Sequence, residues 1–565
     1  MTEHFNNLNT PLRSVHKYPK LTDQELRFRQ CGWSLATARS LWDLWSDPLF
    51  VSVEQRTALN LVEPFDEWEE FILFSSHYFV MEAANNLPRR SAIVQPPSPP
   101  QPEQLLGHVE RWGGITSILH SEPIPKANVR RFGALVQISS DALGHHGGLG
   151  PQTRMGSMDL YGHAEAGSPV GLDPTGIPPR MCHTITALDQ NISLLVGGRT
   201  SPDTALKDCW VFRENWDRVD DLPVALFRHC ATQVDVQLAN QKQTGVLIYG
   251  GKTDGNTVSD KWMLWREGFG WIQLNATGHS LVARFGAAMA STGPGVGILV
   301  GGMGSDGMIV SEMWEWSISG NTKVPSISLR PVEVLAEAAF AFESDLVQCP
   351  SCCDGGELLV RNIIGRIGAS LVKSPPGVLL IGGASVQNPA QDMDFVILTK
   401  GNNNGSGISV WHCATLDIQA GGQRPLLVGH SSLSFHDNVV IIGGGAVCFS
   451  FGTYWNHCVD TLSIDEGQRC IVLPLAARKL DQLPKHDVRK DVDSRVSSAA
   501  APTIPLMVNS ERIGSAQDFD CVLGQGRPVV VHHNHLGSCT SCWTVDSLKE
   551  KIGPDRAVSL SELIL

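Results

Sequence analysis

The chain has 565 residues, too many for a single hydrophobic core, so its length predicts several domains. The formal net charge of −13 excludes a surface that is basic throughout and leaves room only for a narrow basic patch within residues 13–39. The first ten residues are polar, and no apolar run approaches the ~18 residues of a membrane span. We therefore expect a cytoplasmic protein with no membrane segment.

The first 88 residues predict helices that are rich in aromatic side chains. A helix over 22–31 is expected to begin at Thr22, with Glu25 three residues later as in a capping box. A second helix is expected over 64–84, with one apolar face made by Phe65, Trp68, Ile72, Ser75 and Phe79. The acidic residues at 66–70 lie near the positive end of that helix dipole, and we expect them to face solvent.

Two segments of unusual composition divide the chain. Residues 89–104 are rich in proline and predict an extended linker. Residues 479–510 predict a flexible linker, because they are first charged and then small. These linkers leave a leading segment (1–88), a long middle (105–478) and a tail (511–565). We expect the first linker to separate the leading segment from the middle, so that truncating Trp45 disturbs the leading segment alone.

The middle repeats one pattern six times. Each copy has an apolar run that ends in Gly-Gly, such as "GILVGGM" (297–303), and an aromatic residue 11–13 positions after the second glycine. The six aromatic residues are Tyr161, Trp210, Trp262, Trp314, Phe395 and Trp455. Glycine permits a sharp turn beside a neighbouring backbone, and the aromatic side chain can fill the wedge between adjacent sheets. The pattern therefore predicts a mainly β fold with sheets set around an axis.

This spacing closely resembles the kelch β-propeller repeat. The resemblance implies six recognisable blades. The interval of 82 residues between Arg284 and Arg366 is longer than the others, and a seventh, degenerate blade remains open.

Arginine recurs near the start of four copies, at Arg180, Arg228, Arg284 and Arg366. Such residues can ring one mouth of a propeller and bind an anion. A repeated arginine more often pairs within its own blade, and we favour that interpretation.

The leading segment resembles a second family. Residues 18–33, "YPKLTDQELRFRQCGW", and 65–79, "FDEWEEF…HYF", are similar to the late part of the leucine carboxyl methyltransferase family. Fusion of such a domain to kelch repeats resembles the wybutosine-synthesising tRNA methyltransferases. In this family S-adenosylmethionine is bound by a part that would precede Met1, so the resemblance implies an α/β methyltransferase domain of which residues 1–88 are a helical remnant. No cofactor is then expected to bind this chain alone.

The tail resembles the opening of a JmjC-type cupin in residues 526–553, and it is expected to be a short stub of that domain. It contains a crowded group: His532, His533, His535, Cys539 and Cys542. Cys349, Cys352 and Cys353 form another group in the long interval. A structural zinc site usually needs two matched ligand pairs, and none is recognisable, so we predict no metal site.

The resemblance implies that the complete protein methylates and methoxycarbonylates a hypermodified guanosine in tRNA(Phe). Catalytic residues are unknown. Candidate substrate-binding residues are Arg27, Arg29, His77 and Tyr78. For His77 and Tyr78 we favour a packed helix face over a substrate pocket. Two alternatives remain: a non-catalytic kelch interaction protein that holds a protein partner through propeller loops, and a methyltransferase that acts on the C-terminal leucine of a protein.

Overall fold

The computed structural model describes residues 17–62, 65–85, 116–124, 128–162, 176–189, 191–238, 241–319, 325–336, 363–385, 394–401, 408–420, 424–448, 452–464, 506–509 and 529–532. The chain divides into two compact units, Met1–Ala477 and Arg478–Leu565. In the second unit, strands β32 (Leu506–Asn509) and β33 (Val529–His532) pair in parallel. None of the described helices has the length and apolar character that crossing a bilayer would require.

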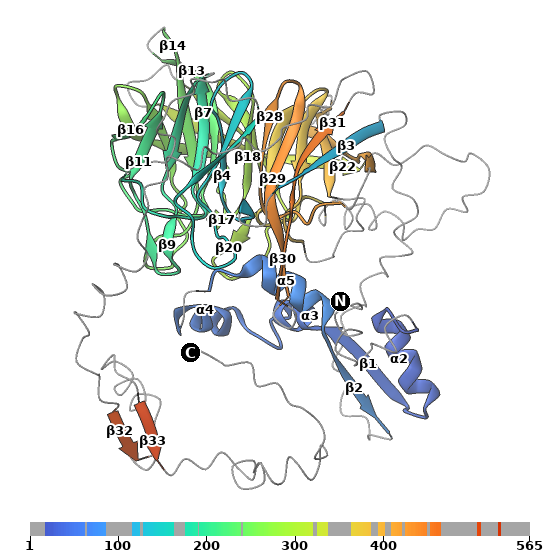
Figure 1. Cartoon of the computed structure of the whole chain (residues 1–565). Helices are drawn as coiled ribbons and strands as arrows, with labels where there is room; N and C mark the ends of the chain where they lie inside the picture. Colours follow the sequence, from blue (N-terminus) through green and yellow to red (C-terminus); the bar gives the residue numbers. More distant parts are fainter. Residues whose placement is uncertain are drawn as a thin grey trace, which may run out of the picture. The chain divides into compact units, whose positions relative to one another are not determined.

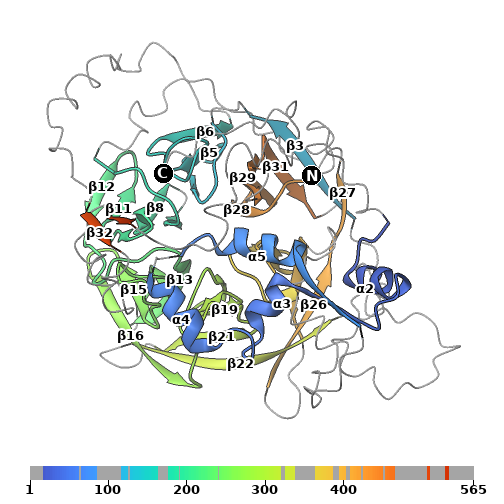
Figure 2. The same cartoon turned by 90° about the horizontal axis from the view of Figure 1, so that it is seen from below.

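Antiparallel blades stand around a common centre in the first unit, as Figure 2 shows. Parallel pairing of outer strands joins three neighbouring blades into one 12-stranded sheet. Blade 1 contains β4 (Ala134–Gln137), β5 (Ala142–His146) and β6 (Met158–Gly162). Blade 2 contains β7 (Thr184–Asp189), β8 (Ile192–Val196), β11 (Cys209–Phe212) and β12 (Trp216–Val219). Blade 3 contains β13 (Cys230–Leu238), β14 (Gln241–Tyr249), β15 (Trp262–Arg266) and β16 (Gly270–Gly278).

The other three blades have the same antiparallel order. Blade 4 contains β18 (Ala288–Gly293), β19 (Val296–Val300), β21 (Met313–Ser319) and β22 (Ser326–Ala336). Blade 5 contains β23 (Ser370–Ser374), β24 (Gly377–Ile381), β25 (Phe395–Lys400) and β26 (Ser409–Thr415). Blade 6 contains β28 (Val428–Phe435), β29 (Asn438–Cys448), β31 (Cys458–Ser463) and β3 (Thr116–Pro123).

Short strands complete the propeller. β9 (Arg199–Ser201) pairs with β10 (Thr204–Ala205), and β17 (Arg284–Phe285) pairs with β20 (Met303–Gly304). β27 (Asp417–Ala420) lies parallel to β3, and β30 (Gly452–Trp455) pairs with the end of β29. β3 precedes blade 1 in the chain but is the outermost strand of blade 6 (Figure 1), so hydrogen bonds between the two ends of the propeller close the ring.

Backbone hydrogen bonds between blades fix their number at six. The N–H of the second glycine of each Gly-Gly pair donates to a carbonyl at the start of the next blade, at 2.7–3.0 Å. The six acceptor carbonyls belong to Arg180, Leu226, Arg284, Arg366, Leu427 and Arg130. Gly302 of blade 4 thus bonds directly to blade 5, and Gly444 of blade 6 bonds back to blade 1. The predicted β-propeller is confirmed with six blades, and a seventh between blades 4 and 5 is wrong, because those two blades are already in contact.

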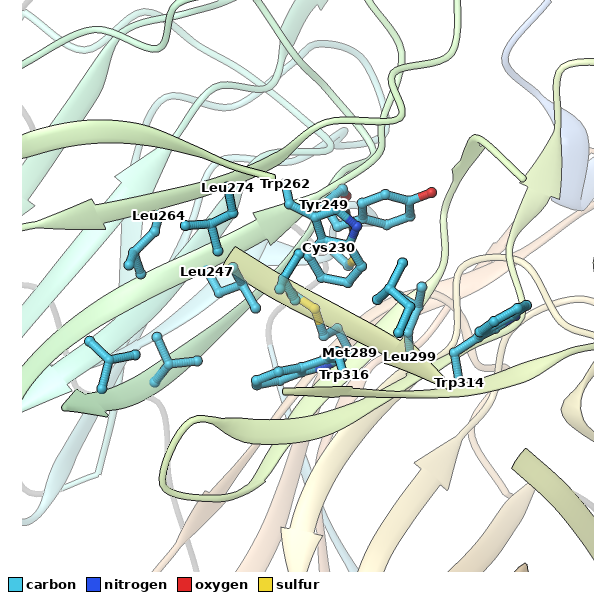
Figure 3. Packing of buried hydrophobic residues seen from close by; sticks show 14 residues of the cluster. Cys230, Leu247, Tyr249, Trp262, Leu264, Leu274, Met289, Leu299, Trp314 and Trp316 are labelled. Atoms are coloured by element: carbon cyan, nitrogen blue, oxygen red, sulfur yellow. Dashed lines mark hydrogen bonds between the residues drawn. The ribbon is translucent and has the colours of Figure 1, made fainter. Parts of the chain in front are cut away.

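Four of the six aromatic residues of the repeat pack between blades, as predicted. Tyr161, Trp262, Trp314 and Phe395 are all buried. Figure 3 shows Trp262 and Trp314 in one cluster with Tyr249 and Leu299, which joins the sheets of blades 3 and 4. Burying side chains of this size removes large apolar areas from water and stabilises the contact between neighbouring sheets. Trp210 and Trp455 are only partly buried, and Trp455 lies on the side strand β30.

The leading segment folds as helices around a two-stranded sheet. Its elements are α2 (Leu21–Gln30), β1 (Leu35–Ser40), α3 (Leu41–Ser46), α4 (Val53–Val62), α5 (Trp68–His77) and β2 (Phe79–Ala84). β1 and β2 pair antiparallel. The first predicted helix is confirmed, but it begins at Leu21 with Lys20 as its cap, and the backbone N–H of Lys20 donates to Asp23.

The second predicted helix, over 64–84, is wrong in its second half. α5 ends at His77, and the chain continues as β2, because Phe79–Ala84 finds hydrogen-bond partners along β1. Trp68, Ile72 and Ser75 form the buried face of α5 as predicted. Phe79 is 39% exposed and belongs to the sheet instead.

Candidate functional site

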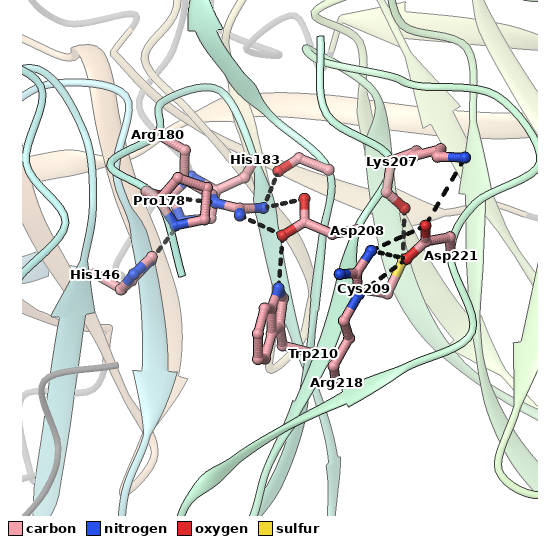
Figure 4. A network of polar contacts seen from close by, with 11 residues as sticks. His146, Pro178, Arg180, His183, Lys207, Asp208, Cys209, Trp210, Arg218 and Asp221 are labelled. Carbon is pink, nitrogen blue, oxygen red and sulfur yellow. Dashed lines mark hydrogen bonds and ion pairs between the residues drawn. The ribbon is translucent and has the colours of Figure 1, made fainter. Parts of the chain in front are cut away.

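Three of the recurrent arginines pair within their own blades, as the favoured interpretation predicted. In blade 2, Arg180 donates to the carbonyl of Gly197 and to both carboxylate oxygens of Asp208 (Figure 4). The indole of Trp210 donates to the same carboxylate at 2.6 Å. Burial works to raise the pKa of Asp208, but the hydrogen bonds and charge of Arg180 outweigh it and hold that pKa below its usual value. The guanidinium is therefore already neutralised and is not a free anion site.

The same arrangement recurs around the ring. Arg284 donates to Gly301 and pairs with Glu312 at 2.9 Å, and Trp314 donates to Glu312. Arg366 donates to the carbonyls of Ile363 and Gly382. These contacts tie the first strand of a blade to its Gly-Gly turn.

Arg228 departs from the repeat. The hydrogen-bonded carbonyl at the start of blade 3 belongs to Leu226, so Arg228 lies two positions beyond the recurrent arginine. The prediction that Arg228 occupies the same position in the repeat as Arg180 is therefore wrong. At its position the backbone has a positive φ, 55°, as it has at Phe132 and Cys182.

The position of Arg228 is one of six equivalent positions around the propeller mouth. The corresponding residues of the six blades are Phe132, Cys182, Arg228, Gly286, Gly368 and Gly429. Five backbone hydrogen bonds of 2.6–3.0 Å join these residues from one blade to the next. Arg228 is the one member of this set with a charged side chain. It therefore distinguishes blade 3 from the other five blades at the mouth.

The chain before α5 and its first turn cover this mouth. Figure 2 shows α5 lying across the centre of the ring. Asp66 accepts from Arg228 at 2.7 Å and pairs with Arg199 at 2.6 Å. Glu69 also pairs with Arg228, and all four side chains are at least nine-tenths buried. We call these ion pairs, together with the pair between Glu70 and Arg131, the mouth latch.

The second pair of the mouth latch joins Glu70 to Arg131 at 2.7 Å. Lys252 donates to the carbonyl of Phe65 at 2.8 Å. Both ends of the acidic run are thus bound to the propeller. The prediction that the acidic run faces solvent is wrong for Asp66, Glu69 and Glu70, because arginines from blades 1, 2 and 3 supply buried partners for these carboxylates. Glu67 is exposed, as expected.

Burial and the paired charges shift the pKa values of the mouth-latch residues in opposite directions. It raises the pKa of Glu69, against the attraction of Arg228. Burial works to lower the pKa of Arg228, but the carboxylates of Asp66 and Glu69 raise it well above its usual range. Burial lowers the pKa of Lys252 to about 8. Removing one partner from such a set leaves a buried charge without compensation, which typically costs about 3–5 kcal/mol.

An apolar rim surrounds the charges. The indole of Trp45 donates to the carbonyl of Gly307 at 3.2 Å, and Trp68 packs on the same glycine. A Cβ at Gly307 would lie 2.8 Å from the ring of Trp68, so only glycine fits there. Trp45 therefore contacts the propeller, and the expectation that its loss disturbs the leading segment alone is wrong.

The structure keeps the four candidate substrate-binding residues apart from the mouth latch. Arg27 and Arg29 are exposed on α2, where the Arg27 guanidinium lies over the ring of Tyr18. Arg29 donates to the carbonyl of Ala36 and lies 3.6 Å from Glu25.

His77 and Tyr78 lie at the end of α5. His77 is exposed, and its Nδ1 lies 2.5 Å from the carbonyl oxygen of Leu73. Tyr78 stacks on Phe74 with ring centroids 4.4 Å apart. These contacts are local to the helix, and a role in substrate binding stays a prediction.

Metal ligands are not gathered in the part of the chain that the structure describes: no three His, Cys, Asp or Glu side chains there are placed to hold an ion. His533, His535, Cys539 and Cys542 lie outside the described residues, as do Cys349, Cys352 and Cys353, and no side chain is described for His532.

Sequence reasoning missed the mouth latch, although one signal was present. In blades 2 and 4 an acidic residue follows the repeated arginine by 28 positions, at Asp208 and Glu312. The residue 28 positions after Arg228 is Asn256. Arg228 therefore has no acidic residue at the spacing found for Arg180 and Arg284. This difference indicates that its partner lies elsewhere in the chain.

Comparisons with known proteins agree with this architecture. Residues 178–458 match a family model described as tRNA wybutosine-synthesizing protein 4, beta-propeller. The propeller belongs to this family. Two proteins named tRNA wybutosine-synthesizing protein 4, from Aspergillus fumigatus and Aspergillus oryzae, are 34% and 35% identical over 100% of this chain. A human protein of the same name is 26% identical over 83% of this chain and 66% of its own length.

The predicted membership of the tRNA wybutosine-synthesizing protein 4 family is thus confirmed. The alignments cover 52% and 53% of the two Aspergillus proteins, so the chain spans about half the length of these relatives.

Proposed function

We propose that this chain is the propeller and adjoining segment of a cytoplasmic protein that synthesises wybutosine in tRNA. The complete protein would methylate the carboxyl group on the side chain of a hypermodified guanosine in tRNA(Phe), with S-adenosylmethionine as methyl donor. It would then help to convert the neighbouring amine to a methoxycarbonyl group. The observation that carries the proposal is the similarity of the whole chain to proteins named for this pathway.

Carboxyl methylation needs the carboxylate to be held in line with the sulfonium methyl group, so the substrate must be oriented. The mouth latch supports such a role for the propeller, because its buried ion pairs hold the leading segment in one rotational position on the ring. An RNA that contacts both α2 and the propeller loops would then meet a fixed surface. S-adenosylmethionine is expected to act in the complete protein and not to bind this chain alone. Calorimetric detection of micromolar binding to the purified chain would contradict that expectation.

Contacts with tRNA must be local, because the net charge is −13. Each neutralised phosphate contributes about −0.9 to the slope of log affinity against log salt on duplex DNA and about −0.7 on single strands. A patch around Arg27 and Arg29 that makes about 3–4 contacts should give a slope of about −2 to −4 with tRNA.

Filter binding with tRNA(Phe) tests this proposal. The double variant Arg27→Glu and Arg29→Glu should weaken binding and flatten the salt slope. A matched control is Arg213→Glu with Arg218→Glu, which changes the same charge at two exposed arginines of blade 2 that already pair with carboxylates. The control should leave the slope unchanged.

The alternatives predict other outcomes. A kelch interaction protein would show no tRNA affinity at ~50 mM salt and would retain a protein partner instead. A methyltransferase for a C-terminal leucine would depend on a protein C-terminus and would ignore tRNA. Either result would contradict the tRNA assignment.

A further inference from the structure

Arg154, in blade 1 near the mouth, has a side chain without a counter-charge. It lies on the hairpin that follows the Gly-Gly pair of blade 1, where its backbone bridges to Leu149. In the part of the chain that the structure describes, its side chain makes no ion pair and no hydrogen bond, and its Nε is buried without an acceptor. Arg180 in blade 2, by contrast, is neutralised by Asp208.

The surroundings of Arg154 are positive. Burial and then the charge of Arg199, on β9, lower the pKa of Arg154. Arg199 pairs with Asp66 through Nη2, but its Nε and Nη1 are buried and have no acceptor among the described residues. Burial raises the pKa of the neighbouring Cys182 to about 11, so this thiol is neutral at pH 7. Two like charges that are partly removed from water raise the free energy of the site unless an anion balances them.

The buried charges at the mouth do not balance. The mouth latch contains three arginines and three carboxylates. Lys252 adds a fourth buried cation, and although burial lowers its pKa to about 8, the ammonium stays largely protonated at pH 7. Arg154 adds a fifth cation beside Arg199. This local excess of positive charge favours an anionic ligand, in a chain whose net charge is −13.

The loops beside Arg154 are open to solvent. Residues 151–153 and 202–204 are exposed, and Arg154 itself is partly exposed. In Figure 2 the helices α3, α4 and α5 lie clear of β5 and β6 in blade 1 and of β8 and β11 in blade 2. A ligand can therefore reach Arg154 from solvent.

Exposed carboxylates on the neighbouring loops bind other groups. Asp203 accepts a hydrogen bond from the hydroxyl of Ser201, and Asp254 accepts one from the backbone N–H of Ala205 at 2.6 Å. Neither carboxylate forms an ion pair with Arg154 in the described part of the chain. The charge of Arg154 is therefore available to a ligand.

We propose that Arg154, with Arg199 beside it, forms a binding site for a phosphate group at the mouth of blades 1 and 2. The planar guanidinium offers paired N–H donors in a geometry that matches the oxygens of a phosphate. A bound phosphate also supplies a counter-charge for both arginines. The inference deepens the proposed function and rests on it for the source of the phosphate, which is the backbone of the tRNA.

Filter binding of tRNA(Phe) to the full chain at several salt concentrations tests the source of the phosphate. Arg154→Gln should weaken binding and reduce the slope of log affinity against log salt by about 0.7–0.9, the value for one phosphate contact. Arg154→Lys keeps the charge and should restore most of the slope, which separates a lost contact from a folding defect. Arg213→Gln, a matched change at an exposed arginine that pairs with Glu267, should leave the slope unchanged.

Thermal melts of the full chain test the site without RNA. Replacing chloride by inorganic phosphate at equal ionic strength stabilises proteins without a specific site, so the comparison is between variants. An anion that binds only the folded state raises the melting temperature further. Arg154→Gln should lose that part of the gain, whereas Arg213→Gln should keep it. Acetate should give no gain that depends on Arg154.

The two measurements separate the outcomes. A reduced tRNA slope in Arg154→Gln supports a phosphate of the RNA backbone, and an unchanged slope with a lost gain in phosphate supports a free phosphate-bearing molecule at the same site. The proposal is overturned if Arg154→Gln behaves like Arg213→Gln in both measurements, or if acetate reproduces the gain seen in phosphate. If the unchanged chain binds no tRNA, the proposed function is contradicted, and the melts alone decide the site.

Discussion

Two sets of buried arginines hold this molecule together in different ways. Arg180 pairs with Asp208, which is 28 residues away in the same blade. Arg228 pairs with Asp66, which is 162 residues away in the leading segment. The first kind of contact recurs in blades 2, 4 and 5, where it ties the start of the blade to its own Gly-Gly turn. The second kind occurs at a position where five other blades carry no charge, so it breaks the pseudo-symmetry of the ring and selects one placement for α5.

The two sets should differ most in the stability that is lost when the arginine is replaced. Arg228→Met leaves Glu69 buried without its arginine partner and leaves Asp66 with Arg199 alone, and it should lower the free energy of unfolding by about 3–5 kcal/mol. Arg284→Met should cost less, about 1–3 kcal/mol, because the side chain of Glu312 is 46% exposed and regains water. Chemical denaturation followed by tryptophan fluorescence measures both. An equal loss of unfolding free energy in the two variants would show that the contact of Arg228 with the leading segment is no more costly to break than the contacts within a blade.

Lowering the pH should change the stability contributed by His430 in the propeller and by Glu69 in the mouth latch in opposite directions. Burial lowers the pKa of His430 to about 4, so the unfolded chain takes up a proton first, and stability is lost as the pH falls from 6.5 toward 4. The loss from this one residue is at most about 3 kcal/mol. Burial raises the pKa of Glu69, so the folded state takes up a proton first, and this residue adds stability as the pH falls.

Thermal melts between pH 7 and pH 4.5 separate these contributions. His430→Gln should flatten the loss of stability on acidification, and Glu69→Gln should steepen it. If both variants change the slope in the same direction, the assignment of opposite proton uptake is wrong.

A smaller effect should follow from the apolar rim. Trp45→Ala removes a partly buried indole from Gly307, and it should cost about 2 kcal/mol, less than the 3–5 kcal/mol expected for the fully buried Trp262. Hydrogen exchange should show faster exchange in α3 and α5 and in the loop at 304–308. Faster exchange in α3 alone would indicate that the leading segment and the propeller are energetically separate.

The propeller could be predicted from the sequence because its signals are local and repeated. Each blade contains its own Gly-Gly pair, the apolar run before it and an aromatic residue such as Trp262. Because the pattern occurs six times, it remains recognisable where one copy departs from it. The number of blades needed the bond from Gly302 to Arg366, because a long interval in sequence does not show whether its ends meet in space. The mouth latch could not be predicted, since the acidic run at 66–70 has the composition of an exposed helix end and its partners are distant in sequence.

A double-mutant cycle between Asp66→Ala and Arg228→Met tests the mouth latch most directly. Denaturant unfolding of the two single variants and the double variant gives the coupling free energy of the pair. We predict a coupling of at least about 1.5 kcal/mol, as measured for close charge pairs elsewhere, because both side chains are buried and joined at 2.7 Å. Effects that add to within about 0.5 kcal/mol would show that the two residues do not interact and would contradict the docking of the leading segment on the propeller mouth.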